Sequence, residues 1–192
     1  LHIVVNGEEY LDGVDITTDE IYDWMRRGIM PATSQVGIAD TVSTLEKLAA
    51  DGSDLLYLAF SSKMSGTFAL VRGILQEMES RYPGQTFCAV DSLSGSFATG
   101  LIAMQAAQMV QQGQPCRAIE ARCLFLAQHV EHVFVITDLN WMVRGGRISR
   151  TMGYTANLFG IKPVLDVRDG EMEVICRARG HRGSLCRVAD LT

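Results

Sequence analysis

The sequence repeats one unit, an apolar strand followed by a polar turn and a helix, and this repeat constrains the fold more than any other feature. Residues 55–60 form a continuous apolar run, as expected for a strand that is buried on both faces. A polar turn over 61–67 and a helical segment follow it. A second apolar run, 86–90, leads into a second polar turn, 91–96, and a second helix. Strands that alternate with helices predict a parallel sheet with right-handed crossovers.

The residues before this repeat predict a hairpin, a capped helix and a loop. A turn at Asn6-Gly7 between two short apolar runs is typical of a β-hairpin. Thr17 and Glu20, three residues apart, form a capping box that should begin a helix. Residues 31–35 are polar and include a proline, so we expect a loop there, followed by an amphipathic helix.

The pattern changes after the second repeat. An apolar run at 133–137 predicts a third strand, and 147–160 is expected to be helical or irregular. The Asp169-Gly170 turn lies between two β-type segments, so residues 161–177 predict a hairpin. An antiparallel element so late in the chain indicates that a second domain begins near its end.

We therefore expect an α/β domain over 1–143, with a parallel sheet and flanking helices, and the start of a second α+β domain with antiparallel strands over 144–192. The net formal charge changes sign at the same place, from −9 over residues 1–143 to +4 over residues 144–192, and eight of the fourteen arginines lie in the second part. Arginine forks suit carboxylates and phosphates, so this basic end is either a solvated face or a docking surface. Nucleic acid is a poor partner, because most of the chain is acidic.

Cysteine usage and hydropathy indicate the compartment. The five cysteines show no Cys-x-x-Cys pair and no zinc-type spacing, so we predict free thiols in a reducing compartment. No apolar run reaches the roughly 18 residues of a membrane span, and no signal peptide opens the sequence. The expectation is a cytoplasmic protein that is not an integral membrane protein. His129 and His132 lack a third metal ligand, and we expect them to be exposed loop histidines.

The polar turns are the candidate binding elements, because open parallel sheets bind ligands beyond the carboxyl ends of their strands. Ser65-Gly66-Thr67 begins a helix whose first N–H groups have no partner inside the helix and attract an anion. Glycine at this point lets a ligand approach the backbone closely. A carboxylate or phosphate group would fit this turn. Serine and threonine are also ordinary helix caps and turn formers, so the pattern alone leaves both interpretations open.

Catalytic interpretations find no complete set of residues. The chain has no glycine-rich dinucleotide or P-loop sequence. Ser65 does not lie in a Gly-x-Ser-x-Gly elbow and no base is placed to activate it, which argues against a hydrolase. Asp91 follows a strand end without a second carboxylate, and it could equally cap a helix. A phosphate- or nucleotide-binding α/β module of the flavodoxin type is the main alternative to a carboxylate-binding protein. We expect no enzyme activity, no metal and no cofactor.

Four ordered segments make the sequence more specific. They are Thr33-Ser34-Gln35, residues 61–67, residues 91–94, and residues 145–149 followed by 161–165. In this order and at about this spacing they resemble the DegV family of bacterial fatty-acid-binding proteins. The resemblance spans essentially all 192 residues. It implies a two-domain, non-enzymatic α/β protein that buries a long, palmitate-like acyl chain between its domains and serves lipid metabolism.

The resemblance also implies roles for individual residues. Thr33 and Ser65 correspond to the family's contacts to the fatty-acid carboxylate, with Gly66 supplying backbone. Some members present the acyl group to a fatty acid kinase, and the arginines that dock this partner correspond to Arg147 and Arg179. Relative to the family, the first strand and much of the second domain are missing, including a histidine of the carboxylate site. We therefore expect a partial chain with an incomplete pocket.

Overall fold

The computed structural model describes residues 1–136, 138–148 and 160–192. Most of the stretch predicted to be helical or irregular, 147–160, lies outside these described residues. The chain forms two compact units, Leu1–Ser43 and Thr44–Thr192. The domain boundary expected at residue 143 stays a prediction.

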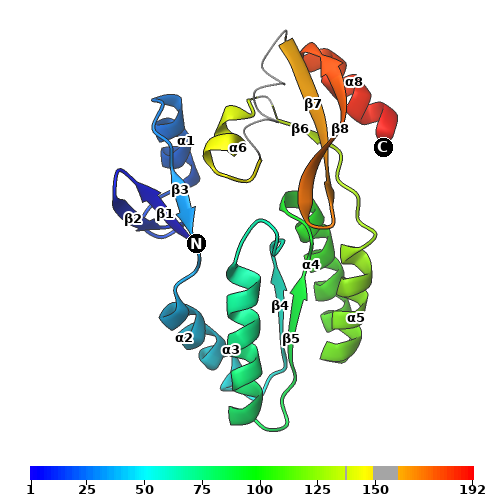
Figure 1. The fold of residues 1–192 in the computed structure, drawn as a ribbon. Coiled ribbons are helices and arrows are strands. Elements are labelled where there is room, and N and C mark those ends of the chain that lie inside the picture. The colour runs from blue at the N-terminus through cyan, green and yellow to red at the C-terminus, as the bar shows by residue number, and fades with distance from the viewer. Residues whose placement is uncertain (137, 149–159) are drawn as a thin grey trace. The chain divides into compact units, whose positions relative to one another are not determined.

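Figure 1 shows the helices and strands, whose bounds agree with most of the predicted elements. The strands are β1 (His2–Val5), β2 (Glu8–Leu11), β3 (Ala32–Ser34), β4 (Leu55–Ala59), β5 (Phe87–Asp91), β6 (Phe134–Val135), β7 (Ile161–Arg168) and β8 (Glu171–Arg179). The helices are α1 (Thr18–Arg26), α2 (Ile38–Ala49), α3 (Thr67–Arg81), α4 (Ser96–Gln111), α5 (Cys116–Ala127), α6 (Asn140–Arg144) and α8 (Gly180–Leu191).

The first unit is an antiparallel sheet with strand order β2-β1-β3, against which α1 packs. Asn6 and Gly7 adopt positive φ angles of 53° and 87°, and they join β1 to β2 in the predicted tight hairpin. The predicted capping box is confirmed, because the Thr17 hydroxyl accepts the Glu20 N–H while the Glu20 carboxylate accepts the Thr17 N–H at 2.8 Å. Ile3 is buried at the centre of this small core.

The prediction of a loop at 31–35 was wrong. Residues 32–34 form β3, which pairs antiparallel with β1 and places Thr33 opposite Ile3. Its side chains are mostly exposed and show no apolar alternation, which is the pattern on which strand prediction depends. The strand forms because β1 has a second backbone edge, and the N–H and C=O groups along that edge need partners.

The second unit contains the predicted parallel strands. β4 and β5 pair in parallel, with Leu55 opposite Phe87 at one end and Ala59 opposite Asp91 at the other. Figure 1 shows α3 on one side of these strands and α4 and α5 on the other. Val90 is fully buried against α4 and α5. This packing brings the carboxyl ends of β4 and β5, and the two polar turns that follow them, to one edge.

The predicted third strand at 133–137 does not extend this parallel sheet. Its described part is β6, Phe134–Val135, which pairs antiparallel with β7; residue 137 lies outside the described residues. Among the residues that the structure describes, the parallel sheet therefore has two strands. An apolar run identifies a buried strand but carries no information about the strand with which it pairs, and here the open edge of β7 is the partner.

The late antiparallel element is confirmed. β6, β7 and β8 form a sheet in that order, and the β7–β8 turn has positive φ angles at Asp169 (50°) and Gly170 (85°), as a two-residue hairpin requires. α8 packs against this sheet and was not predicted. Leu165 is fully buried in the apolar core against which this sheet packs. The fold is thus the expected α/β class, with a parallel sheet, flanking helices and additional antiparallel strands.

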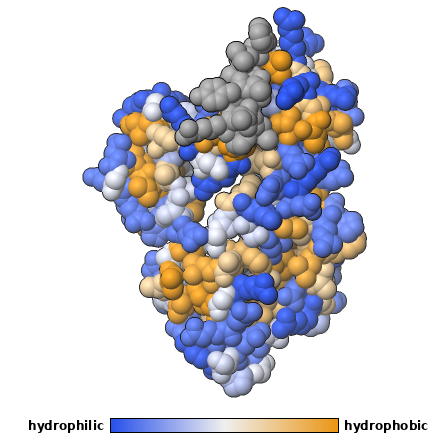
Figure 2. Space-filling model, in the orientation of Figure 1, coloured by the Kyte–Doolittle hydropathy of each residue, from blue (hydrophilic) through white to orange (hydrophobic). Residues whose placement is uncertain are grey.

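The surface of both units mixes hydrophilic and apolar patches, as Figure 2 shows for one face. Among the exposed apolar side chains, Phe97, Leu101 and Met104 lie on α4 at the spacing of one helix face, and Phe97 is 89% exposed. Within the described ranges, the helices are too short or too polar to cross a membrane.

Candidate functional site

The polar loops that follow β4 and β5 are hydrogen-bonded to each other. Ser61 is fully buried, and its backbone N–H donates to the carbonyl oxygen of Ser94 at 2.9 Å. The side chain of Asp91 joins the same two loops, because its Oδ1 accepts the N–H groups of Ser62 at 3.1 Å and Leu93 at 3.0 Å. Asp91 therefore fixes the loop backbone. It does not cap α4, whose N-cap residue is Gly95.

The second loop carries two buried hydroxyl groups. The Ser92 hydroxyl lies 3.2 Å from that of Thr99 and also accepts the Ser94 N–H at 3.2 Å. The Ser94 hydroxyl is buried and has no hydrogen-bond partner among the described residues. Leu93 and Ser96, on either side of Ser94, both have positive φ angles. The loop is thus a constrained polar turn and not a simple helix cap.

Ser65 and Gly66 stand where α3 begins, as predicted. Ser65 is half-buried, its hydroxyl lies 3.0 Å from that of Thr67, and it accepts the Thr67 N–H at 3.3 Å. Gly66 is exposed, occupies the N-cap position and contributes no side-chain capping bond. The amino end of this 15-residue helix therefore has a serine hydroxyl beside it and a solvent-exposed backbone at Gly66. This arrangement suits an anionic head group.

Thr33 lies on β3, in the first unit, with its residue exposed. Ser65 lies in the second unit. Each is placed within its own unit, and the predicted meeting of Thr33, Ser65 and Gly66 on one carboxylate stays a prediction.

The tip of the β7–β8 hairpin rests on the first polar loop. The Ser61 hydroxyl donates to the carbonyl oxygen of Gly170 at 2.7 Å. A Cβ at Gly170 would lie 2.6 Å from Ser61 Oγ and 3.0 Å from Lys63 Cγ, so no larger residue fits without movement of the loop. The antiparallel sheet and the loops of the parallel sheet therefore form one continuous structure around the candidate site.

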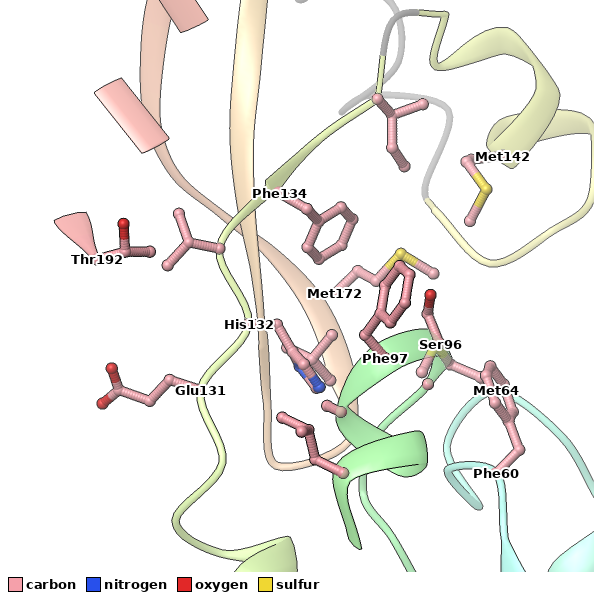
Figure 3. Close-up of a pocket in the computed structure, with 16 residues that line it drawn as sticks. Phe60, Met64, Ser96, Phe97, Glu131, His132, Phe134, Met142, Met172 and Thr192 are labelled. Carbon is pink, nitrogen blue, oxygen red and sulfur yellow. The ribbon is translucent and has the colours of Figure 1, made fainter. Parts of the chain in front are cut away.

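A cavity of about 510 Å³ opens beside these loops (Figure 3). It is lined by Phe60, Met64, Gly95, Ser96, Phe97, Ala98, Leu101, Glu131, His132, Val133, Phe134, Ile136, Met142, Val167, Met172 and Thr192. Most of these side chains are apolar, and Met64 stands next to Ser65 in the chain. Such a volume lies within the range of small-molecule pockets, roughly 300–1,000 Å³. The site therefore combines an apolar chamber with an anion-type turn at its border.

Sequence reasoning missed this cavity because its lining comes from segments far apart in the chain. No single helical or strand period connects Phe60, Phe97 and Phe134. A usable signal was present, since Phe60 precedes the first polar turn and Phe97 follows the second. In the structure Gly95 lies close to this aromatic ring, since a Cβ at Gly95 would lie 2.5 Å from the Phe60 ring.

The two histidines behave differently from each other. His129 is exposed, and its ring stacks on Phe125 at 3.9 Å between ring centres. The expectation of an exposed loop residue was wrong for His132, whose ring lies among the apolar residues of the cavity in Figure 3. Both of its ring nitrogens are buried and have no hydrogen-bond partner in the described part of the chain. Burial lowers the pKa of His132, and the nearby Asp166 carboxylate opposes this effect.

No group of residues within the described ranges could hold a metal ion.

The arginines predicted to dock a partner are both exposed. Arg147 follows α6, and its guanidinium donates to the carbonyl oxygen of Gly145. With Lys63 and Glu171 it lines a second, more polar cavity of about 310 Å³. Arg179 is the N-cap residue of α8. Ser149, the last residue of the motif that contains Arg147, lies outside the described residues.

Comparison with known proteins identifies the family. The family model described as "Uncharacterised protein, DegV family" matches residues 1–192. A DegV domain-containing protein of Clostridium perfringens is 35% identical over 184 residues, which are 94% of this chain and 63% of the relative. The chain therefore spans less than two thirds of that relative's length.

Two solved structures agree in fold with this chain. A DegV family protein from Thermus thermophilus, described by its fatty acid binding, is 28% identical, with a TM-score of 0.85 over 99% of this chain and 66% of that one. A fatty acid binding DegV family protein from Streptococcus agalactiae is 27% identical, with a TM-score of 0.84 over 99% of this chain and 67% of that one. Because the family model matches residues 1–192 of this chain, the chain belongs to the DegV family.

Proposed function

We propose that this protein binds a long-chain fatty acid and is not an enzyme. The observation that carries the proposal is the apolar cavity of about 510 Å³ next to the turn that contains Ser65. The acyl chain lies in this cavity. On one side it contacts Phe60 and Phe97, which lie near the parallel strands, and on the other side Phe134 and Met172, which lie on the antiparallel sheet. Two solved relatives above 25% identity are described as fatty-acid-binding proteins, which supports the same ligand class.

The carboxylate is held at the polar border of the cavity. The Ser65 hydroxyl and the backbone at Gly66, at the amino end of α3, receive the negative charge. Thr33 contributes its hydroxyl from the first unit. None of these groups needs a metal or cofactor to bind a carboxylate, so the fatty acid is the only ligand that the proposal requires.

Affinity comes mainly from the acyl chain. Burying a methylene group gains about 0.8 kcal/mol, so a chain of about 16 carbons gains on the order of 10 kcal/mol before the cost of immobilising it. The hydroxyl groups then fix the orientation of the ligand and recognise its end. This division explains how a site with few polar side chains still selects an acid.

Arg147 and Arg179 form the proposed docking surface for a fatty acid kinase that acts on the bound acyl group. Both arginines are exposed on the basic part of the chain after residue 144. Arginines at interfaces steer association and provide strong contacts.

We place this carrier in the bacterial cytoplasm, where a kinase has its phosphate donor and cysteines stay reduced.

Extraction of the purified protein with organic solvent, followed by mass spectrometry, tests the ligand. We expect a long-chain fatty acid at a stoichiometric amount. The double variant Thr33→Val, Ser65→Ala should lose it while keeping the wild-type circular dichroism, because exposed and half-buried hydroxyls add little to the core. The control is Thr18→Val, Ser80→Ala, which removes the same groups from exposed sites on α1 and α3.

Two results would contradict the proposal. Stoichiometric fatty acid on the Thr33→Val, Ser65→Ala variant would remove the head-group assignment. An extract without fatty acid, together with heat released on titration with inorganic phosphate or a mononucleotide, would favour the flavodoxin-type alternative, which uses the same start of α3.

The docking role is tested separately from ligand binding. Arg147→Ala and Arg179→Ala, made in the full-length protein, should leave fatty-acid affinity within about twofold of wild type. They should slow acyl phosphate formation by an added fatty acid kinase, and the wild-type rate should fall as salt rises. Loss of fatty-acid affinity in Arg147→Ala would instead make this arginine a carboxylate ligand.

A further inference from the structure

Two of the five cysteines, Cys88 and Cys116, touch each other inside the second unit. The Cys116 thiol donates a hydrogen bond to Cys88 Sγ, and the two sulfur atoms lie 3.3 Å apart. The sulfur atoms of a disulfide lie about 2.0 Å apart, so a bond between these two requires them to approach by about 1.3 Å. The structure therefore holds two thiols close to bonding distance, and the proposed ligand site uses neither of them.

The two thiols differ in how close they lie to the surface. Cys88 is the second residue of β5, and Cys116 is the first residue of α5. Cys88 is 1% exposed, whereas Cys116 is 8% exposed and directly follows an exposed stretch, residues 110–115. A small oxidant such as hydrogen peroxide therefore meets Cys116 first.

The surroundings of the pair favour the ionised form of Cys116 over that of Cys88. Burial raises the pKa of both thiols. The hydrogen bond between them raises the pKa of Cys88 further but lowers that of Cys116. Cys116 also stands at the amino end of a 12-residue helix, where the helix dipole stabilises a thiolate. Cys116 is therefore the nucleophile of the pair, and Cys88 lies where it can trap the oxidised product.

We propose that Cys88 and Cys116 form a site of reversible oxidation, at which a peroxide joins them in a disulfide. The Cys116 sulfur attacks the peroxide, so that an S–O bond forms, the O–O bond breaks and one water leaves a sulfenic acid behind. The Cys88 sulfur then attacks the Cys116 sulfur, so that an S–S bond forms and the S–O bond breaks with loss of a second water. Two thiols are oxidised and one hydrogen peroxide is reduced, which gives one disulfide and two waters.

The disulfide would close a segment that contains part of the ligand site. Residues 88–116 include the second polar turn and the whole of α4, whose Phe97 and Leu101 line the apolar cavity. A cross-link between the two ends of this segment restricts the unfolded chain, so we expect the oxidised protein to unfold at a higher temperature. Protein that has not met an oxidant keeps five free thiols. The inference does not depend on the identity of the ligand.

The test treats the full-length protein with hydrogen peroxide, in a Cys186→Ser background that removes the exposed thiol. After alkylation of the remaining thiols in denaturant, trypsin and a protease that cleaves before aspartate cut the chain after Arg81, before Asp91 and after Arg117. We expect mass spectrometry to find residues 82–90 joined to residues 91–117, and a thiol reductant should separate them. The reaction should quicken as pH rises, because the thiolate is the reactive form.

Single variants in the same background assign the two roles. Cys116→Ala should abolish the cross-link and leave Cys88 as a thiol that alkylation still reaches. Cys88→Ala should let Cys116 proceed to a sulfinic acid, because no second thiol traps the sulfenic acid. Cys123→Ala is the matched control, since Cys123 is also buried on α5, and it should keep the cross-link.

The digest of the Cys186→Ser protein decides the inference even if one of the core variants fails to fold. The inference is overturned if Cys88 and Cys116 both remain open to alkylation after peroxide treatment. Sulfinic acid at Cys116 beside a free Cys88 thiol would overturn it as well, because the two sulfur atoms would then be unable to meet. A disulfide from Cys88 to Cys123 would equally contradict the assigned pair.

Discussion

Gly170, at the tip of the β7–β8 hairpin, is the residue whose substitution should be least tolerated near the site. Its φ angle is +85°, and a Cβ would lie 2.6 Å from Ser61 Oγ. We expect Gly170→Ala to lower the free energy of unfolding by about 2–4 kcal/mol, from backbone strain plus the steric clash. Urea unfolding followed by circular dichroism measures this.

Gly113 provides the matched control for that substitution. It has a similar positive φ of 69°, but no atom lies within 4 Å of the point where a Cβ would stand. Gly113→Ala therefore adds backbone strain alone, about 1 kcal/mol. If the two variants were equally destabilised, the close packing of the hairpin tip on the loop would carry no energy.

Asp91 gives a second prediction at this scale, because its carboxylate holds two loops. Asp91→Ala removes the acceptor for the N–H groups of Ser62 and Leu93 and should cost about 2–4 kcal/mol of unfolding free energy. Asp91→Asn keeps the accepting oxygen and should cost clearly less. Equal losses in thermal or urea unfolding would show that the negative charge, and not the pair of hydrogen bonds, is what the fold requires.

His132 should make stability depend on pH in the mildly acidic range. Its pKa is lowered in the folded protein by burial, whereas the unfolded chain keeps an ordinary value near 6.5. Between these two values the unfolded state binds a proton that the folded state does not, so stability falls as pH falls below about 6.5. Urea midpoints measured from about pH 7.5 to about pH 5 should decline, and the decline should be shallower in His132→Gln. A decline of unchanged slope in that variant would contradict this assignment.

At the scale of single elements, the capping box predicts the local stability of α1. The Thr17 hydroxyl and the Glu20 carboxylate each accept the other's backbone N–H. Thr17→Ala should destabilise the helix by about 1 kcal/mol, and native-state hydrogen exchange should quicken at the first turn of α1. Thr18→Ala, one residue further on, is the control and should change exchange little. Unaltered exchange in Thr17→Ala would mean that tertiary packing alone holds the helix.

Elements with a strong periodic or turn signal were predictable from the sequence, and those held by backbone pairing were not. The strand β4 is an apolar run, β5 is apolar up to its last residue, Asp91, and the Asp169-Gly170 turn has residues that accept positive φ. β3 carries no apolar pattern and forms through hydrogen bonds to β1. β6 was recognised as a strand, but its antiparallel partner β7 lies more than twenty residues away, and local sequence does not encode that choice.

The candidate site shows the same division. The Ser65 turn and the strand-end position of Asp91 follow from local chemistry, which a short window of sequence displays. The cavity does not, because Phe60, Phe97 and Phe134 reach it from separate segments. The sequence around His132 is typical of a loop. Only the packing around β6 buries its two ring nitrogens, which have no hydrogen-bond partner among the described residues.

At the scale of the whole molecule, the cysteines predict a graded reactivity. Cys88, Cys116 and Cys123 are buried, and burial raises the pKa of all three thiols, whereas Cys186 is exposed. A thiol reagent at neutral pH should modify Cys186 first and the three buried residues slowly, because the thiolate is the reactive form. All five should react after denaturation without reductant. A missing pair of thiols under those conditions would reveal a disulfide and contradict the expected reducing compartment.

The hydrogen bond between Ser61 and Gly170 joins residues 109 positions apart in the chain. Contacts between residues so far apart in the chain form late in folding. The chain must first lose the entropy of closing the long loop, and only then does the contact stabilise it. The loop after β4 is thus completed only when the hairpin has been synthesised and has docked. A nascent chain that has not yet left the ribosome beyond β7 lacks the Ser61–Gly170 hydrogen bond, so we expect the proposed fatty acid to load only after the hairpin has been translated.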